Sequence, residues 1–372
     1  DLMILDAVKI RNFKAVRDSG SVKLGPLTAF VGNNGAGKSS LIEALETYQA
    51  VVANGLDTAM QRFMGIEHVQ NKRARADTPI SFELRIRGPF GKTRLSMAVA
   101  SDASRGSYAI TAESVVCKEH KPLAVFSEQE HEGFRKRWES GFSMLGSNVD
   151  LLAYANLVES WQFLTLAPER MGYPLPQKRT GGRVRLARDG SNIAEFLVEL
   201  RDLDPRVLDG IIRTMAYVLP YARDLQPAIT SELERKAWLQ LTEGEFKVPG
   251  WMLSTGTLRV LALLALLRHP LPPPLVVVEE IENGLDPRSI HLLVEEMRNA
   301  VLSGATQVVL TTHSPYLLDL LKLDQLVLVV RDSVGEPRFH RPASSARLND
   351  WAKDFAPGRL YTMGAMHEAA QP

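Results

Sequence analysis

The residues of this chain best suited to chemistry begin with a glycine-rich loop near its start. The loop fits the pattern G-x-x-x-x-G-K-[S/T], follows an apolar strand-like segment and opens an amphipathic helix from about Lys38 to Ala50. Its backbone N–H groups can surround phosphate oxygens, Lys38 can reach the β- and γ-phosphates, and Ser39 can bind Mg²⁺. The pattern predicts a site for ATP and Mg²⁺, with the nucleotide-binding residues Gly32, Asn33, Asn34, Gly35, Ala36, Gly37, Lys38, Ser39 and Ser40.

The sequence also indicates whether this site binds ATP or GTP. A guanine-reading Asn-Lys-x-Asp pattern would be expected in a GTP-binding protein. Residues 71–74 read Asn-Lys-Arg-Ala and fail at the fourth position, and no other segment fits. ATP is therefore favoured over GTP.

A second set of candidate residues follows the apolar strand predicted at residues 275–278. We expect Glu279 to orient Mg²⁺ through its waters and Glu280 to polarise the water that attacks the γ-phosphate. Glu282 lies two residues further on and could share either task. His313 follows another apolar strand, and ligands collect at the carboxyl ends of such strands. It could donate to the γ-phosphate or the transition state, with a purely structural hydrogen bond as the alternative.

The elements that must position these residues indicate an α/β protein. Short, continuously apolar strands alternate with helices, which predicts a buried parallel sheet covered on both faces. Residues 80–87 and 93–99 alternate in polarity around a Gly-Pro-Phe-Gly turn and predict an antiparallel hairpin. Residues 128–218 are expected to be mainly helical, with a capping box at Asn192 and Glu195 and an N-cap at Asp204.

Composition limits the class of protein. The 372 residues carry a formal net charge of +1, so the overall charge argues neither for nor against a nucleic-acid partner. The single cysteine, Cys117, cannot form an internal disulfide, and the longest apolar runs are far below the roughly 20 residues that span a bilayer. We therefore expect a cytoplasmic protein that has no membrane partner.

Taken together, these motifs resemble the ATP-binding-cassette (ABC) ATPases of the RecF/SMC branch, and within it the OLD-like and related ATPases of bacterial defence. The resemblance also rests on Ile10-Arg11-Asn12-Phe13-Lys14, on the Gly284-Leu285-Asp286-Pro287 D-loop, and on Leu253-Ser254-Thr255-Gly256, which is similar to the cassette signature Leu-Ser-Gly-Gly. It implies an ABC-ATPase head fold with a mixed parallel sheet, an antiparallel β subdomain and a helical lobe.

The resemblance also implies roles for residues and a division of the chain. Arg11, Asn12 and Asp286 would contact the nucleotide, and Ser254 and Gly256 would bind the γ-phosphate held by a second protomer, so that two heads dimerise around two ATP molecules. The expected parts are residues 1–120, the first half of the ATPase lobe; 121–250, a helical lobe; 251–342, the second half of the ATPase lobe; and 343–372, a C-terminal tail.

Departures from the family narrow the functional hypotheses. Glu279 stands where cassette transporters usually carry Asp, and Gln162 is the one weak candidate for a Q-loop glutamine, which disfavours a transporter subunit. OLD nucleases carry a Toprim domain after the ATPase, and residues 351–372 are too short for one. The favoured hypothesis is therefore an ATP-dependent switch that controls a separate effector, expected to be a nuclease, in anti-phage defence. A RecF-like DNA clamp is the alternative.

DNA stays a candidate partner on the strength of three cationic segments. They are Lys178-Arg179 with Arg183, Arg185 and Arg188; Arg135-Lys136-Arg137; and Lys72-Arg73-Ala74-Arg75. Such clusters can grip phosphates without reading sequence, but solvated loops of this composition are ordinary and no stacking aromatic residues are interleaved.

Overall fold

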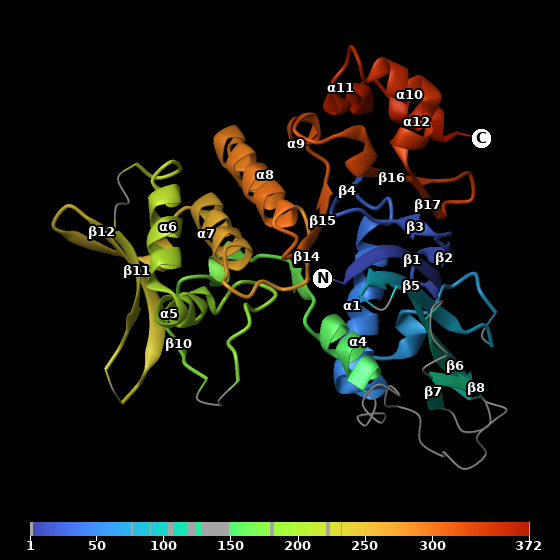
Figure 1. Cartoon of the computed structure of the whole chain (residues 1–372), viewed down its shortest axis with the longest axis horizontal. Coiled ribbons are helices and arrows are strands. Elements are labelled where there is room, and N and C mark those ends of the chain that lie inside the picture. The colour runs from blue at the N-terminus through green and yellow to red at the C-terminus, as the bar shows by residue number, and fades with distance from the viewer. Residues whose placement is uncertain are drawn as a thin grey trace. The chain divides into compact units, whose positions relative to one another are not determined.

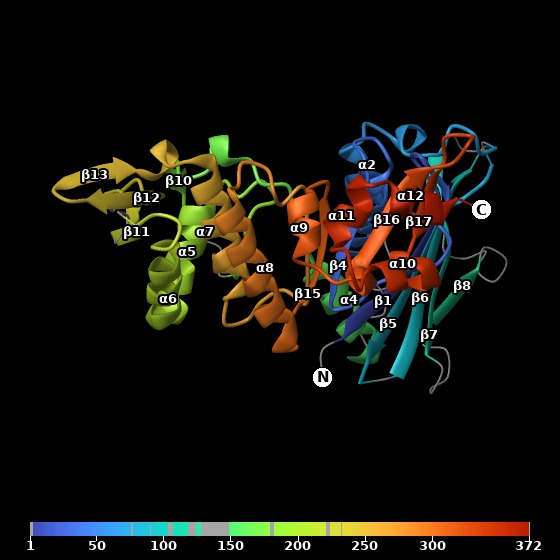
Figure 2. The same cartoon turned by 90° about the horizontal axis from the view of Figure 1, so that it is seen from above.

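The computed structural model describes residues 3–75, 77–89, 91–102, 107–117, 124–127, 149–178, 182–220, 224–231 and 233–371. These residues cluster into two compact units, each treated separately below (Figures 1 and 2). Unit 1 joins residues 1–161 to residues 321–372, and unit 2 is residues 162–320. The four-part division of the chain expected from the sequence remains a prediction.

Unit 1 contains an antiparallel sheet in the order β2-β1-β5-β6-β7-β8, with β3 also paired to β1. Its strands are β1 (Ile4–Phe13), β2 (Val16–Asp18), β3 (Val22–Lys23), β5 (Ile80–Gly88), β6 (Gly91–Asp102), β7 (Ser107–Cys117) and β8 (Ala124–Ser127). Alternate residues of β5, such as Phe82 and Leu84, are buried while those between are more exposed, as a sheet with one solvated face requires. The predicted hairpin of residues 80–99 is confirmed by the pairing of β5 with β6.

The glycine loop of unit 1 lies between β4 (Leu27–Val31) and α1 (Lys38–Asn54), as predicted. All five residues of β4 are buried. β4 pairs in parallel with β16 (Leu326–Arg331), which pairs antiparallel with β17 (Pro337–His340). The other helices of unit 1 are α2 (Leu56–Gln61), α4 (Val149–Glu159), α10 (Ala346–Trp351), α11 (Pro357–Thr362) and α12 (Ala365–Ala370), with short 3₁₀ turns η1 (Ile66–His68), η4 (Leu323–Gln325) and η5 (Pro342–Ser344).

Unit 2 contains three parallel strands, β9 (Gln162–Leu164), β14 (Leu275–Val278) and β15 (Gln307–Thr312), with β14 paired to both others. Every residue of the three strands is buried, as expected for strands that are covered on both faces. Helices α7 (Thr255–Leu267), α8 (Pro287–Leu302) and α9 (Pro315–Asp319) accompany β14 and β15. The predicted alternation of strand and helix after residue 250 is confirmed.

The remainder of unit 2 corrects part of the prediction. Helices α5 (Ile193–Leu203) and α6 (Pro205–Met215) are present, and so is the Asp204 N-cap, whose side chain accepts from the Arg206 N–H. The capping box is wrong, because Asn192 and Glu195 instead accept hydrogen bonds from the Ala187 and Lys178 N–H groups.

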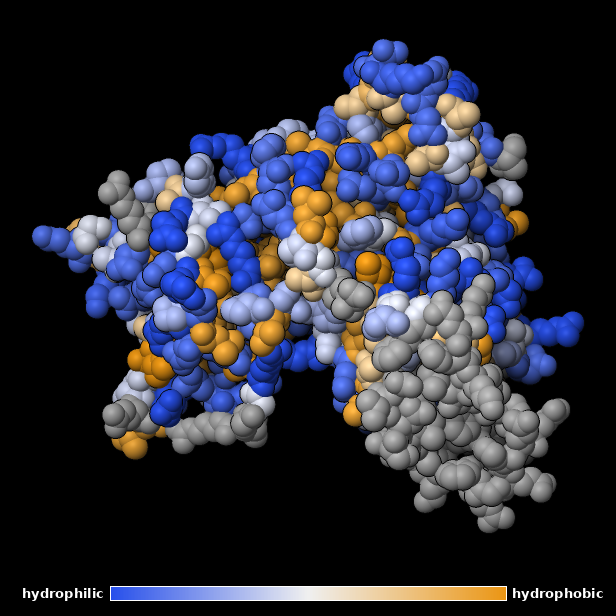
Figure 3. All heavy atoms as spheres, viewed as in Figure 1, coloured by the Kyte–Doolittle hydropathy of each residue, from blue (hydrophilic) through white to orange (hydrophobic). Residues whose placement is uncertain are grey.

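The expected helical lobe also contains strands. β10 (Leu175–Pro176), β11 (Asp224–Ile229), β12 (Lys236–Glu243) and β13 (Phe246–Pro249) form an antiparallel sheet beside α5 (Figure 2), and the short turns η2 (Pro168–Arg170) and η3 (Gly250–Met252) complete the unit. Alternate residues of β12 are buried, which is the period of a half-buried strand. The core side chains of both units are aliphatic and aromatic, and polar residues cover most of the face seen in Figure 3.

Candidate active site

The glycine loop of unit 1 has the backbone geometry of a phosphate cradle. Gly35 and Gly37 have φ of 77° and 112°, which side-chain-bearing residues rarely adopt, and Gly37 directly precedes the first residue of α1. Lys38 is 7% exposed, and its Nζ donates to the carbonyls of Gly32 and Asn33, the latter at 3.1 Å. The ammonium group is thus held inside the loop, next to a helix N-terminus that favours anions.

The C-terminal part of unit 1 encloses this loop. A Cβ added at Gly32 would overlap the Val329 carbonyl of β16, and one added at Gly37 would overlap the side chain of Pro337 in β17. Arg331 Nε donates to the Gly35 carbonyl at 2.7 Å, and the Tyr361 hydroxyl of α11 donates to Asn33 Oδ1 at 3.2 Å. Burial raises the pKa of the Tyr361 phenol, which keeps it a hydrogen-bond donor. None of these partners could be found from the loop motif itself.

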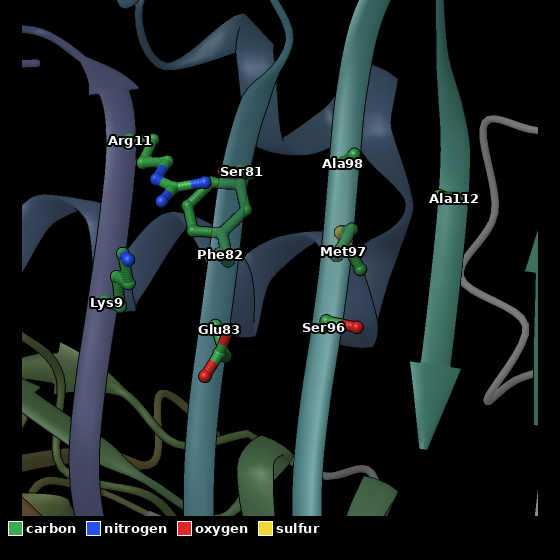
Figure 4. A pocket seen from close by; sticks show the side chains of 9 residues that line it. All are labelled: Lys9, Arg11, Ser81, Phe82, Glu83, Ser96, Met97, Ala98 and Ala112. Atoms are coloured by element: carbon green, nitrogen blue, oxygen red, sulfur yellow. The ribbon is translucent and has the colours of Figure 1, made fainter. Parts of the chain in front are cut away.

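Among the described residues, neither Arg11 nor Asn12 forms a hydrogen bond with the glycine loop. Arg11 pairs with Asp18 at 3.0 Å and lines a small hollow on the solvated face of the antiparallel sheet, as Figure 4 shows. Asn12 has φ of 57°, is 9% exposed and donates to the Pro79 carbonyl. Their expected contacts with the nucleotide remain a prediction.

In unit 2 the first acid, Glu279, lies directly after β14. Its Oε1 accepts from the Thr165 hydroxyl at 3.2 Å and lies 3.4 Å from Arg188 Nη2. Arg188 was grouped by sequence with a cationic loop, whereas the structure pairs it with this acid. Arg179 and Arg135-Lys136-Arg137 lie outside the described residues, so DNA binding by those clusters remains a prediction.

The second acid, Glu280, has an unusual backbone. Its φ is 49°, a left-handed conformation that costs a residue with a side chain about 1–3 kcal/mol. The surrounding structure holds it there: the Glu280 N–H donates to buried Thr311 Oγ1 at 2.9 Å, and Asn283 Nδ2 donates to Glu280 Oε2 at 2.6 Å. Strain of this kind gathers at functional sites, and here it directs an exposed carboxylate.

The third acid, Glu282, is oriented toward the histidine. Its Oε1 accepts from the His313 N–H at 2.7 Å and lies 3.1 Å from His313 Nδ1. The Glu282 side chain is 7% exposed while that of His313 is 45% exposed, so the imidazole is presented to solvent by a buried carboxylate. Glu282 can therefore fix the orientation of His313, but it is poorly placed to polarise a water itself.

The segment that resembles the cassette signature begins α7. Exposed Ser254 is its N-cap and accepts from the Thr257 N–H, leaving the first N–H groups of an apolar, buried helix beside it. Gly256 is close-packed against the D-loop, because an added Cβ would lie 2.5 Å from the Gly284 carbonyl oxygen. Asp286 caps α8 by accepting from the Ser289 N–H and is exposed.

Arg259 lies on the signature helix, and Gln162, the candidate Q-loop residue, lies in β9. Burial lowers the pKa of the Arg259 guanidinium, while nearby carboxylates, Glu280 and Glu282 among them, act in the opposite direction. Arg259 therefore lies within electrostatic reach of the acids, a proximity that spacing along the chain does not reveal.

Gln162 is buried in β9 and donates to the Leu186 carbonyl, so its side chain is already engaged.

The residues proposed for Mg²⁺ supply oxygen ligands of the kind this cation prefers. Ser39 presents an exposed hydroxyl in the first turn of α1, and Glu279 presents a carboxylate at the end of β14. Among the described residues, no group of three or more His, Cys, Asp or Glu side chains could hold a metal ion. Mg²⁺ in phosphoryl-transfer sites needs only one or two protein oxygens, since phosphates and waters complete its shell, and each of these two side chains taken by itself is a ligand of that kind.

Comparison with known proteins decides the family. Residues 121–319, more than half of the chain, match the family described as "AAA domain, putative AbiEii toxin, Type IV TA system". The chain belongs to this family. Residues 3–51, which include the glycine loop, match a second family described as "AAA ATPase domain". This AbiEii-like AAA protein is accordingly an ATPase.

Solved structures agree on the fold. An SMC head bound to the C-winged-helix domain of ScpA has a TM-score of 0.59 at 13% identity, covering 90% of this chain and 96% of that one. An SMC head with an extended coiled coil, bound to the C-terminal domain of ScpA derived from Pyrococcus furiosus, has a TM-score of 0.54 at 12% identity, covering 95% and 100%. The AbiEii-like AAA protein therefore has the α/β fold of ABC-type ATPase heads, as predicted.

Curated relatives match a smaller part of the chain. The Nod factor export ATP-binding protein I of Mesorhizobium japonicum is 31% identical over 38% of this chain and 38% of its own length, and that of Sinorhizobium fredii is 30% identical over the same shares. The chain thus spans less than two fifths of these relatives. Within the described residues, no helix combines the length and apolar character needed to cross a bilayer.

Proposed function

We propose that this ATPase is a switch that dimerises head to tail around two ATP molecules and controls a separate effector, which we expect to be a nuclease, in bacterial anti-phage defence. The family description, with its toxin and toxin–antitoxin terms, supports a role of this class. The ScpA domains bound to the structurally similar SMC heads support partner binding by a fold of this kind. The proposal also rests on the resemblance of the sequence motifs to OLD-like ATPases without a Toprim domain.

The observation that carries the proposal is the exposed, serine-capped start of α7. A helix N-terminus favours anions, and Ser254 and Thr255 are exposed at this one, with Gly256 packed against Gly284 of the D-loop. In the proposed dimer this terminus binds the γ-phosphate held by the loop of the other protomer. Dimerisation then depends on ATP, and hydrolysis releases it, because ADP lacks the group that α7 recognises.

In the proposed chemistry each acid has one task. Glu280 accepts a proton from the attacking water, Glu279 orients Mg²⁺, and Glu282 holds His313 so that its imidazole can donate to the γ-phosphate. Lys38 and the loop N–H groups bind the phosphates, and Mg²⁺, when bound, neutralises charge on the β- and γ-oxygens. Preorganised donors of this kind lower the barrier without moving during the reaction.

The test is the native mass of Glu280→Gln, purified from its own host, with and without Mg-ATP. We expect a monomer that becomes a dimer with ATP, and an additional co-purified mass that reports the effector. Ser254→Asp in the same background should bind ATP yet stay monomeric, because aspartate still caps the helix but repels the incoming phosphate.

Ser345→Asp provides the matched control, since Ser345 also caps a helix, α10, by accepting from the Leu348 N–H. It should dimerise normally. A Glu280→Gln protein that binds ATP and remains monomeric would overturn the proposal. Retention of DNA without any partner protein would instead favour the RecF-like clamp.

A further inference from the structure

A cavity of about 700 Å³ in unit 1 has a strongly cationic wall and no assigned role. Five basic residues line it: Lys23 of β3, Arg85 of β5, Lys92 and Arg94 of β6, and Arg341 after β17. Among the residues that the structure describes, Asp6 is its one acidic lining residue, and it pairs with Arg87 at 3.0 Å. The cavity involves neither the glycine loop nor any residue of the proposed ATPase site.

The strand register brings like charges together at this cavity. Arg85 of β5 lies directly opposite Arg94 of β6, and Arg87 lies directly opposite Lys92. Residues opposite each other in an antiparallel pair have Cβ atoms about 5 Å apart, where like charges destabilise the sheet. Two consecutive cationic pairs on one solvated face are an arrangement that an anionic ligand would relieve.

Few acids compensate these charges. Arg85 contacts Glu83 at 3.2 Å, but among the described residues no carboxylate lies within ion-pair distance of Lys23, Lys92 or Arg94. Arg341 is fixed differently, because it donates to the backbone carbonyls of Lys23 and Asp324 at 3.1 and 2.6 Å. Arg341 is thereby held at the cavity by neutral carbonyls, and none of the described carboxylates pairs with it.

The shape of the cavity points to a small ligand. Its volume falls within the roughly 300–1,000 Å³ typical of small-molecule sites. Leu24, Ile86 and Val116 form the apolar part of its lining, here termed the floor, and the basic lining residues come from several separate segments. A hollow on the same sheet, lined by Lys9 and Arg11, is far smaller, at about 140 Å³ (Figure 4).

We propose that this cavity binds a small molecule bearing several phosphate groups, of the size of a nucleoside polyphosphate. Three or more negative charges would bridge the opposed cations of β5 and β6 to Lys23 and Arg341, and the apolar floor would contact a base or sugar. This site is independent of the proposed function and would give the ATPase a second ligand that could report a signal to it.

The experiment separates the cavity from the glycine loop. The full chain carrying Lys38→Ala, which should bind ATP at the loop about 100-fold more weakly than the parent, is titrated by calorimetry with ATP and with inorganic tripolyphosphate at low salt. We expect one bound ligand per chain, weakened about tenfold or more when Lys92→Glu and Arg94→Glu are added. Equal affinity for the two probes would assign recognition to phosphates alone, and tighter binding of ATP would show that the floor also contributes.

Controls keep the result interpretable. Arg213→Glu with Lys247→Glu makes the same change of net charge at exposed positions of unit 2 and should leave binding unchanged. Lys92→Gln with Arg94→Gln weakens the site without reversing its charge, and thermal melting of each variant checks folding. The proposal is overturned if neither probe binds, if the Glu variants bind as well as the parent, or if only a DNA duplex binds.

Discussion

The glycine loop of unit 1 and the acid cluster of unit 2 are built on different principles. In the loop, backbone conformation and close packing set the geometry: Gly37 needs a positive φ and contacts Pro337, and Lys38 is held by carbonyls. In the cluster, each acid is oriented by another side chain, as Glu282 and His313 are. A motif defined by residue type can predict the first kind of site closely, whereas the second depends on contacts that no spacing encodes.

Among the variants that test this difference between the two regions, Glu280→Gln should have the largest effect on ATP hydrolysis. Loss of the proton acceptor should lower kcat for ATP hydrolysis about 1,000-fold, since general bases contribute roughly 10²–10⁴-fold, while ATP affinity is kept. Phosphate release measures the first and nucleotide titration the second. Asn283→Ala removes a side chain that donates to the Glu280 carboxylate and should lower kcat far less. Turnover close to that of the parent would reject Glu280 as the base.

Lys38→Ala should have the second largest effect, and this effect should fall on ATP affinity, which Glu280→Gln leaves unchanged. Removing the ammonium group should weaken ATP binding about 100-fold, because hydrogen bonds to charged groups contribute roughly 1.5–3 kcal/mol and this one acts in a buried loop. Fluorescent nucleotide titration gives the affinity, and an unchanged melting temperature excludes misfolding. ATP binding equal to that of the parent would contradict the assignment of the loop.

Glu282→Gln tests whether the acids have separate tasks. A glutamine keeps the acceptor for the His313 N–H but loses the charge beside the imidazole, so kcat should fall about tenfold with KM nearly unchanged. The decisive measurement is the double variant with His313→Ala, which should be no slower than His313→Ala alone, because both changes act through one imidazole. Additive losses would mean that Glu282 acts on the nucleotide or its metal directly.

The smallest expected effect belongs to the contact between α11 and the loop. Tyr361→Phe removes the hydrogen bond to Asn33 and should change ATP affinity by about two- to tenfold, in line with roughly 0.5–1.5 kcal/mol for a neutral hydrogen bond. Tyr316→Phe, at an exposed position in α9 of unit 2, serves as the control. No change in affinity would mean that the loop is held adequately without α11.

The helices and strands around both regions could be predicted from the sequence. The tertiary contacts that orient the site residues could not. Strong periodicity at residues 275–312 and a motif of known context at residues 32–40 made the strands and helices there predictable. The strands of residues 224–249 were missed in part because Trp238, on the less buried face of β12, interrupts the alternation of apolar and polar residues. The capping box failed because Asn192 and Glu195 bond to a neighbouring loop instead. Thr311, Arg188 and Arg259 lie near the acids only through tertiary packing, so no local signal could identify them.

The packing of β16 and β17 against the glycine loop has a consequence for folding during synthesis. Arg331 and Gly35, which it bonds, are 296 residues apart in the chain. At a synthesis rate of roughly 5–20 residues per second, the loop leaves the ribosome about 15–60 s before the strand that packs against it exists. Until then the nascent loop lacks the strands that pack against it, so we expect nucleotide to be captured only after residues 326–340 have been synthesised.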